Sequence, residues 1–158
     1  MSGSIKSAHF VLEQCYWCAG LFLNFLAETQ DTDGQYTLIE TVVRQGTEPP
    51  PHTHTYEDEA LLVLEGELEI RHGSKSSFLK AGEVVNMPKG SEHYFRCVTP
   101  EVRLFIKLSP SGLESGFKSF GVPVKEFLLP PPREQVPGFH EIAQIFARWG
   151  VHFSLPQP

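Results

Sequence analysis

The sequence predicts an all-β protein, built as an antiparallel sandwich or barrel, and two observations carry this prediction. Between Phe10 and Ser109 the chain is a succession of short segments rich in Val, Ile, Leu, Thr and Phe, separated by turn residues at fairly regular intervals. No segment in this range shows the apolar period of a helix. Many short strands without intervening helices indicate antiparallel pairing rather than parallel βαβ units.

Turn signals delimit the predicted strands. Asp33-Gly34 joins Leu21–Glu28 to Tyr36–Arg44 as a predicted hairpin. The remaining turns are expected at Gly66, His72-Gly73, Ala81-Gly82, Pro88-Lys89-Gly90 and Thr99-Pro100.

The pattern changes after Ser109. A short amphipathic segment, Leu113–Phe120, precedes a proline-rich stretch that predicts an extended strap over residues 121–137. Apolar residues then recur at helical spacing, which predicts a short C-terminal α-helix over about residues 139–149 that covers the barrel. These residues are Ile142, Ile145, Phe146 and Trp149. The segment Val151–Leu155 is expected as a last strand or an edge contact.

The composition is that of a folded globule, and we expect a single domain over residues 1–158. Hydrophobic residues make up 41% and charged residues 20% of the chain, enough apolar surface to offset the entropy of ordering it. The formal net charge is -6, and no run of Lys or Arg offers the positive surface that a phosphate backbone requires. We therefore expect no nucleic-acid partner.

The most apolar early segment, Cys15–Leu26, is too short to span a bilayer as a helix, and Asn24 interrupts it. Only Lys6 precedes it, whereas a signal peptide needs a basic start and a small-residue cleavage site. The three cysteines do not form the even set of a disulfide framework. We expect no membrane association and a cytoplasmic location.

The segment His52-Thr53-His54 places two imidazoles on the same face of an extended strand. A turn after His54 brings Glu59 back at the start of the next strand. A second tight turn, Pro88-Lys89-Gly90, leads into His93 at the start of another predicted strand. Three imidazoles and a carboxylate predict one divalent transition metal, Mn, Fe, Co, Ni, Cu or Zn, with open positions for water or substrate.

Two neighbouring carboxylates, Glu57 and Asp58, compete with Glu59 for the fourth ligand position. Alternation from Glu59 sends Leu61 and Val63 to the same inner side of the strand, which favours Glu59. Glu57 and Asp58 are expected to be solvated.

Two motifs resemble those of the cupin superfamily. The first is Gly46-x5-His52-x-His54-x4-Glu59-x6-Gly66. The second is Gly82-x5-Pro88-x-Gly90-x2-His93, with Cys97 where the family usually has Asn. Together they cover residues 46–97, and the flanking segments resemble small single-domain cupins similar to quercetin 2,3-dioxygenase.

This resemblance implies a double-stranded β-helix, or jelly-roll barrel, with the metal bound by the four predicted ligands at its inner end. It also implies a homodimer, and a small-molecule substrate that enters from the open mouth. We expect an apolar, aromatic-lined pocket beside the metal. The residues expected to line it are Trp17, Phe22, Phe95 and Phe105.

Three other signals are weaker. The pair Cys15 and Cys18 forms a CxxC, but on a strand this spacing sends the sulfurs to opposite faces, so buried packing is expected. His140-Glu141 begins like HExxH, yet Gln144 stands at the second histidine position. His9, His72, His140 and His152 are expected at the surface.

Two classes of function remain open. In the first, the metal binds an enolate or phenolate oxygen, Glu59 serves as the catalytic base, and O2 is inserted into an aromatic or polyketide-like substrate. Isomerisation or decarboxylation could follow the same Lewis-acid logic. In the second, the protein is a non-catalytic module that binds a small ligand.

Overall fold

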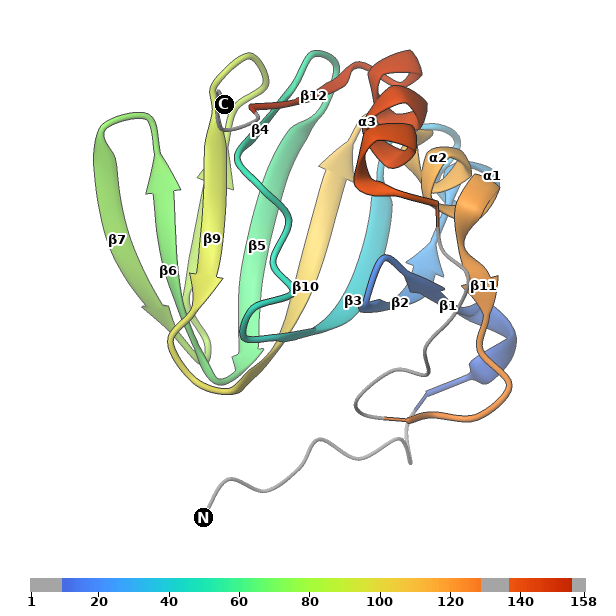
Figure 1. The fold of residues 1–158 in the computed structure, drawn as a ribbon, viewed down its shortest axis with the longest axis horizontal. Helices are drawn as coiled ribbons and strands as arrows, with labels where there is room; N and C mark the ends of the chain where they lie inside the picture. Colours follow the sequence, from blue (N-terminus) through green and yellow to red (C-terminus); the bar gives the residue numbers. More distant parts are fainter. Residues whose placement is uncertain (1–9, 129–136, 155–158) are drawn as a thin grey trace.

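Two antiparallel β-sheets face each other in the computed structural model, which describes residues 10–128 and 137–154 (Figure 1). This confirms the predicted all-β jelly roll. The larger sheet has the strand order β11 (Val122–Pro123), β1 (Cys15–Cys18), β2 (Leu21–Ala27), β3 (Thr37–Arg44), β10 (Glu101–Ser109), β5 (Asp58–Glu65) and β8 (Val84–Met87). The smaller sheet has the order β12 (Val151–Phe153), β4 (His52–His54), β9 (His93–Cys97), β6 (Glu67–His72) and β7 (Lys75–Lys80).

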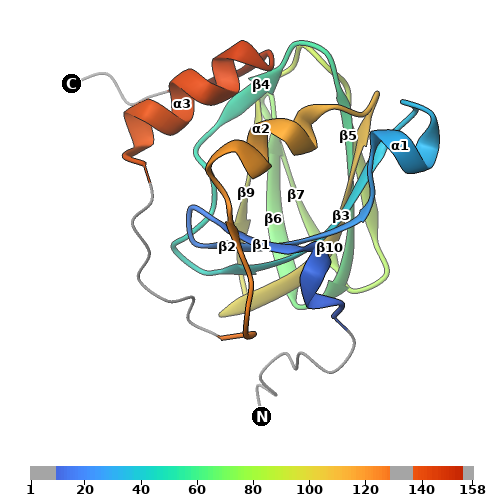
Figure 2. The same cartoon turned by 90° about the vertical axis from the view of Figure 1, so that its right-hand side faces the viewer.

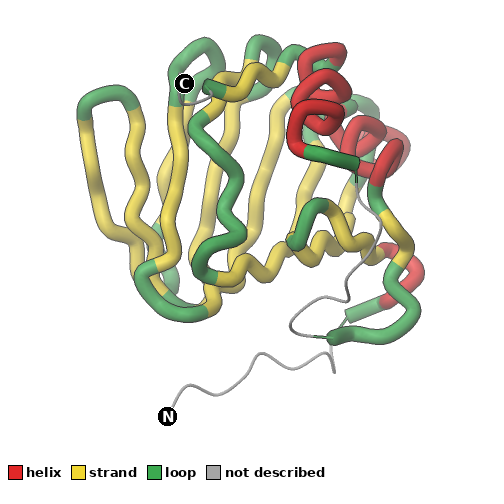
Figure 3. Tube along the Cα trace, in the orientation of Figure 1, coloured by secondary structure: helices red, strands yellow, loops and turns green. Residues whose placement is uncertain are grey.

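The helices are short and gather at one side of the barrel (Figure 3). They are the 3-10 helix η1 (Leu12–Gln14), α1 (Thr29–Thr32), α2 (Leu113–Phe120) and α3 (Phe139–Arg148). Figure 2, viewed from the right-hand side of Figure 1, shows α2 and α3 in front of the strands. The predicted C-terminal helix is confirmed as α3. None of the helices in the described ranges is long and apolar enough to cross a membrane.

The predicted hairpin of β2 and β3 is confirmed, with a loop that is longer than a two-residue Asp-Gly turn. The strands do pair, as expected, but α1 occupies the loop between them. Asp33 ends α1 in the left-handed conformation, with φ 53, and Gly34 follows with φ 78. The Asp-Gly signal therefore marks a helix end inside a longer hairpin loop.

Strand alternation divides the interior into a sealed end and an end that carries the helices. At the sealed end, both sheets contribute apolar side chains, including Leu61, Val63 and Leu104 from one sheet and Leu68 and Ile70 from the other. These five are at most 1% exposed. At the other end, Leu23, Ile39 and Leu108 pack with residues of α2 and α3. The space for a site therefore lies beneath the helices.

Gly66 makes the turn from β5 to β6, where the chain passes from one sheet to the other. Its φ is +89, and a Cβ atom there would lie 2.6 Å from the carbonyl oxygen of Glu101. Only glycine fits both the backbone conformation and the close approach. This explains the glycine that ends the first motif.

The buried carboxylate of Glu114 fixes α2 to the barrel. One oxygen accepts hydrogen bonds from the backbone N–H and the hydroxyl of Thr29, and the other from the hydroxyl of Thr37 and the N–H of Gly112. Burial alone would raise the pKa of Glu114, but these hydrogen bonds outweigh it and lower the pKa to about 2.

Helix α2 in turn contacts the end of α3. A Cβ atom on Gly116 would lie 2.9 Å from the indole of Trp149, so the missing side chain permits the contact. The proline-rich strap predicted over residues 121–137 falls largely on residues 129–136, which lie outside the described part of the chain.

Candidate metal centre

Three strands bring the four predicted ligands together. His52 and His54 lie two residues apart on β4 and face the interior, and His93 begins β9 directly opposite His52. Glu59 lies near the start of β5 on the facing sheet, with Leu61 and Val63 on its inner side. All four side chains are buried.

The ligand atoms converge on one point. Glu59 Oε2 lies 2.8 Å from His93 Nε2, 3.1 Å from His54 Nε2 and 4.0 Å from His52 Nε2. One donor atom from each of the four residues lies within 4.8 Å of all the others. These separations are those of atoms that could share a metal ion.

Each imidazole has a second contact on its other nitrogen. His52 Nδ1 lies 2.9 Å from the carbonyl oxygen of Pro50, and His93 Nδ1 lies 3.2 Å from that of Ser91. His54 Nδ1 lies 3.2 Å from Glu57 Oε2. With Nδ1 donating to these oxygens, every Nε2 is turned toward the common point, where it can bind a metal when it carries no proton.

The electrostatics of the centre favour a cation. Burial lowers the pKa of His52 to about 4, which keeps this ring neutral at neutral pH. Burial also opposes protonation of His54, but Glu57 and Glu59 outweigh it and raise the pKa of His54 to about 9. Burial would raise the pKa of Glu59, yet its contacts with His54 and His93 hold it well below the usual range.

A divalent metal fits this donor set. Three ring nitrogens and the carboxylate of Glu59 face one point, and in the metal-free protein a proton on His54, which lies between Glu57 and Glu59, supplies part of the balancing charge. A metal at that point would displace this proton and replace its charge. Mixed nitrogen and oxygen donors suit a transition metal better than Mg or Ca, which prefer oxygen alone.

The expectation that Glu57 is solvated is wrong. Its side chain is buried, with 5% of the residue exposed, and it contacts His54. The loop that joins β4 to β5 turns Glu57 back toward the centre, whereas Asp58 stays exposed and accepts a hydrogen bond from the N–H of Lys89. Of these two adjacent carboxylates, Glu57 therefore supports the site and Asp58 lies at the surface.

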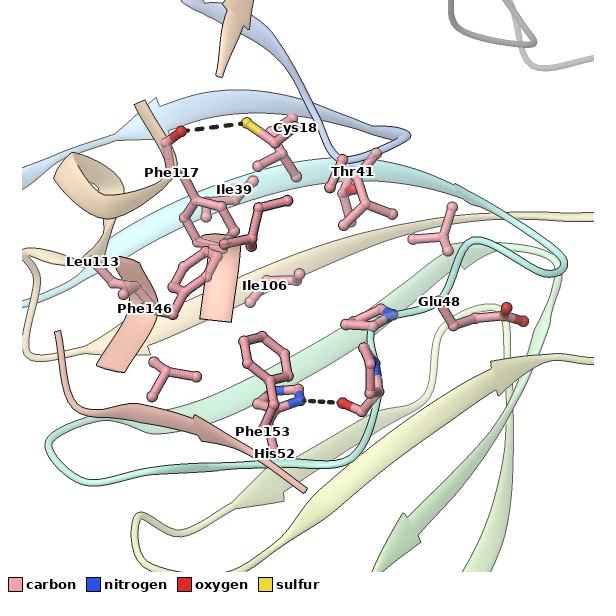
Figure 4. A pocket seen from close by; sticks show the side chains of 18 of the residues that line it. Cys18, Ile39, Thr41, Glu48, His52, Ile106, Leu113, Phe117, Phe146 and Phe153 are labelled. Carbon is pink, nitrogen blue, oxygen red and sulfur yellow. Dashed lines mark hydrogen bonds between the residues drawn. The ribbon is translucent and has the colours of Figure 1, made fainter. Parts of the chain in front are cut away.

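An apolar cavity of about 210 Å³ adjoins the centre (Figure 4). His52, His54 and Glu59 form part of its wall, and inward-facing aliphatic residues of β2, β3 and β10 form another part. Aromatic side chains complete it: Phe95 from β9, Phe117 and Phe120 from α2, Phe139 and Phe146 from α3, and Phe153 from β12.

Phe95 lies in the cavity wall, but the structure places the other three expected residues elsewhere, which corrects the predicted lining. Trp17 and Phe22 pack against Phe127 on the opposite face of the larger sheet. Phe105 lies between the inward-facing Leu104 and Ile106 on β10, so alternation turns it outward as well.

The sequence reasoning missed the phenylalanines of α2, α3 and β12. The helical spacing of α3 predicts an element that covers the barrel, but not which side chains reach the cavity. An amphipathic helix next to the open end of a barrel was the available signal, because its apolar face must point inward.

The cysteines are packing residues. Cys15 and Cys18 face opposite sides of β1, as expected, and Cys18 Sγ lies 3.6 Å from the carbonyl oxygen of Phe117. Burial raises the pKa of Cys15 to about 12. Cys97 is also buried, and its backbone N–H donates to Glu48, so it supports the β9 end rather than the ligand set.

Comparison with known proteins identifies a family match over the strands that carry the four candidate ligands. The family model described as Cupin domain matches residues 39–106, which contain all four predicted ligands. Residues 39–106 therefore form a cupin domain.

Three known proteins resemble parts of this chain. Quercetin 2,3-dioxygenase of Bacillus subtilis is 24% identical over 105 residues, which are 66% of this chain but only 31% of that enzyme. A putative ethanolamine utilization protein Q from Salmonella typhimurium is 32% identical, with a TM-score of 0.50 over 58% of this chain and 71% of that one. KdgF from Halomonas sp. has a TM-score of 0.57 at 18% identity, over 63% of this cupin and 91% of that chain, and shows the shared fold alone.

Proposed function

We propose that this cupin is a metal-dependent dioxygenase that acts on a small aromatic or polyketide-like molecule. One observation carries the proposal: a buried cluster of three imidazoles and one carboxylate opens directly onto an apolar cavity. Distant similarity to quercetin 2,3-dioxygenase supports the type of reaction. A dioxygenase places both atoms of O2 in its product, so the reaction needs no external reductant.

A metal held by His52, His54, Glu59 and His93 supplies Lewis acidity for an enolate or phenolate oxygen and, where it is redox active, chemistry with O2. The protein's own residues prepare the substrate. The carboxylate of Glu59 lies at the cavity wall, where it can accept the proton of an enol or phenol. The apolar wall excludes water from the reacting atoms.

The proposal is tested by elemental analysis of protein purified without added metal, followed by oxygen uptake with flavonols, diketones and catechols. We expect one bound transition metal per chain, and oxygen uptake that stops when a chelator removes it. His52→Ala should lose metal and activity together, because it removes a buried ligand. His140→Ala is the matched control, since His140 is an exposed histidine on α3.

Two results would contradict the proposal at different levels. If alanine variants of all four ligands retained stoichiometric metal, the site itself would be wrong. If oxygen uptake survived removal of the metal, the site could stand but the dioxygenase would not.

A further inference from the structure

The cavity has two chemically unlike ends joined by a row of aromatic rings. Phe153 lies beside the ligand His52, with ring centroids 5.5 Å apart, and Phe146 lies 5.9 Å from Phe153. Phe117 and Phe120 follow at 5.0 and 5.7 Å from Phe146. The row thus runs from the metal ligands at one end to α2 at the other, as Figure 4 shows for Phe153, Phe146 and Phe117.

Away from the metal ligands, the polar groups of the wall are already bonded to the protein. The hydroxyl of Thr41 donates to the carbonyl of Phe22, and that of Thr47 donates to the carbonyl of Arg44. The carboxylate of Glu48 accepts from the backbone of Gly46 and Cys97.

No Lys or Arg lines the cavity among the residues that the structure describes. A ligand with a carboxylate or phosphate at the far end would therefore bury its charge without a counter-ion. That cost is large in an apolar site.

The size of the cavity restricts the ligand further. A buried apolar cavity of about 150 Å³ is enough for one benzene ring. This cavity, at about 210 Å³, exceeds that by the space of a few more atoms, so a three-ring flavonol would have to extend beyond it through the open side.

We propose that this site takes a compact, single-ring molecule with its oxygen atoms at one end and an uncharged apolar tail at the other, as in an alkyl catechol. The proposal rests on the proposed metal site and names its substrate class. The oxygen atoms lie at the metal ligands, and the tail lies along the row of phenylalanines. A flavonol is too large to lie wholly within the cavity, and a molecule with a carboxylate on its tail would bury that charge without a counter-ion.

The aromatic end of the cavity is formed by residues outside the segment that matches the family model. Phe117, Phe146 and Phe153 all follow residue 106, where the match to the family model ends. These three residues therefore determine the length of tail that the site accepts.

The experiment is calorimetric titration of zinc-loaded protein, because zinc has no redox chemistry and the ligand is then not consumed. The probes are 4-methylcatechol, 3,4-dihydroxybenzoate, which carries a carboxylate on the tail, and quercetin, a flavonol. We expect 4-methylcatechol to bind at least about tenfold more tightly than either of the others.

Phe117→Ala should lengthen the far end, so we expect 4-tert-butylcatechol to gain about tenfold in affinity relative to 4-methylcatechol. Phe78→Ala is the matched control, because Phe78 is 59% exposed on β7 and is not part of the cavity wall. It should leave this ratio unchanged.

The outcomes separate the two proposals. Failure of the wild-type protein to bind zinc would overturn the metal site and with it the proposed function. Zinc-loaded protein that binds 3,4-dihydroxybenzoate or quercetin as tightly as 4-methylcatechol, or that binds none of the three, would overturn only the substrate class. This comparison needs no variant to fold.

Discussion

Each imidazole of the metal centre has an oxygen acceptor behind it, and only one of these acceptors carries a charge. Pro50 and Ser91 offer backbone carbonyls, whereas Glu57 offers a buried carboxylate to His54. A carboxylate behind a ligating histidine fixes the ring and strengthens it as a donor. We therefore expect Glu57 to position His54 for metal binding.

We expect Glu57→Ala to weaken zinc binding by about 10- to 100-fold, because His54 loses both the hydrogen bond and the charge behind it. Glu57→Gln should fall between wild type and Glu57→Ala, since the amide oxygen still accepts from Nδ1. Competition with a chromophoric chelator measures these affinities.

Asp58→Asn provides the control for the loss of one negative charge, because Asp58 is exposed and adjacent in sequence. It should bind zinc as the wild type does. Equal zinc affinities for Glu57→Ala and Asp58→Asn would show that Glu57 has no role in positioning His54.

At the scale of residues, the four candidate metal ligands could be predicted from the sequence, but the contact of Glu57 with His54 could not. Strand alternation puts His52 and His54 on one face of β4, and it puts Glu59 on the inner side of β5 with Leu61 and Val63. Glu57 sits in the turn itself, where alternation does not apply. Only the loop backbone decides whether it points inward.

Among the elements, α2 is held over the cavity by the carboxylate of Glu114 and by its contact with α3. Because the pKa of Glu114 is lowered from 4.5 to about 2 in the folded protein, its charged form stabilises the fold. This contribution is complete above pH 4.5 and is lost as the pH falls from 4.5 toward 2.

We expect Glu114→Gln to lower the free energy of unfolding at pH 7 by about 2 kcal/mol, because the amide nitrogen cannot accept the bonds that one carboxylate oxygen accepts. The variant should also lose less stability than wild type between pH 4.5 and pH 2. Urea unfolding at several pH values measures both effects. Parallel pH dependences for the two proteins would contradict the assignment.

Gly116→Ala should destabilise the contact between α2 and α3. The new Cβ atom would lie 2.9 Å from the indole of Trp149, and relieving that overlap costs about 1–3 kcal/mol, more than the gain in helix propensity. Thermal unfolding should show a lower midpoint. Ser115→Ala, at an exposed neighbouring position, is the control. It should change the free energy of unfolding by no more than about 0.5 kcal/mol.

At the scale of elements, periodicity predicted the strands and α3 because both have regular spacing. It could not fix which face of β1, β2 or β10 points inward. A shift of one residue exchanges the two faces of a strand, and this is how Trp17, Phe22 and Phe105 were assigned to the cavity. Pairing with β3, β5 and β11 settles the faces, and these contacts are long-range.

In the whole molecule, the metal centre connects the two sheets. His52, His54 and His93 belong to the smaller sheet, and Glu59 belongs to the larger one. A metal bound to all four would therefore hold the sheets together, and any unfolding that separates them must release it.

We expect saturating zinc to raise the free energy of unfolding by about 4 kcal/mol at a free concentration near 1,000 times Kd. At the same free zinc concentration, Glu59→Ala should lose most of this gain, because the larger sheet then has no ligand. Chemical unfolding with zinc and with a chelator measures the difference. An unchanged gain in Glu59→Ala would show that the metal does not bridge the sheets.

The four candidate metal ligands all precede residue 106, whereas most aromatic residues of the cavity wall follow it: Phe117, Phe120, Phe139, Phe146 and Phe153. Mutations after residue 106 can therefore alter which molecule enters while the coordinating residues stay the same. For protein engineering, α2, α3 and β12 can be varied together, while the strands that carry the four candidate ligands are kept unchanged.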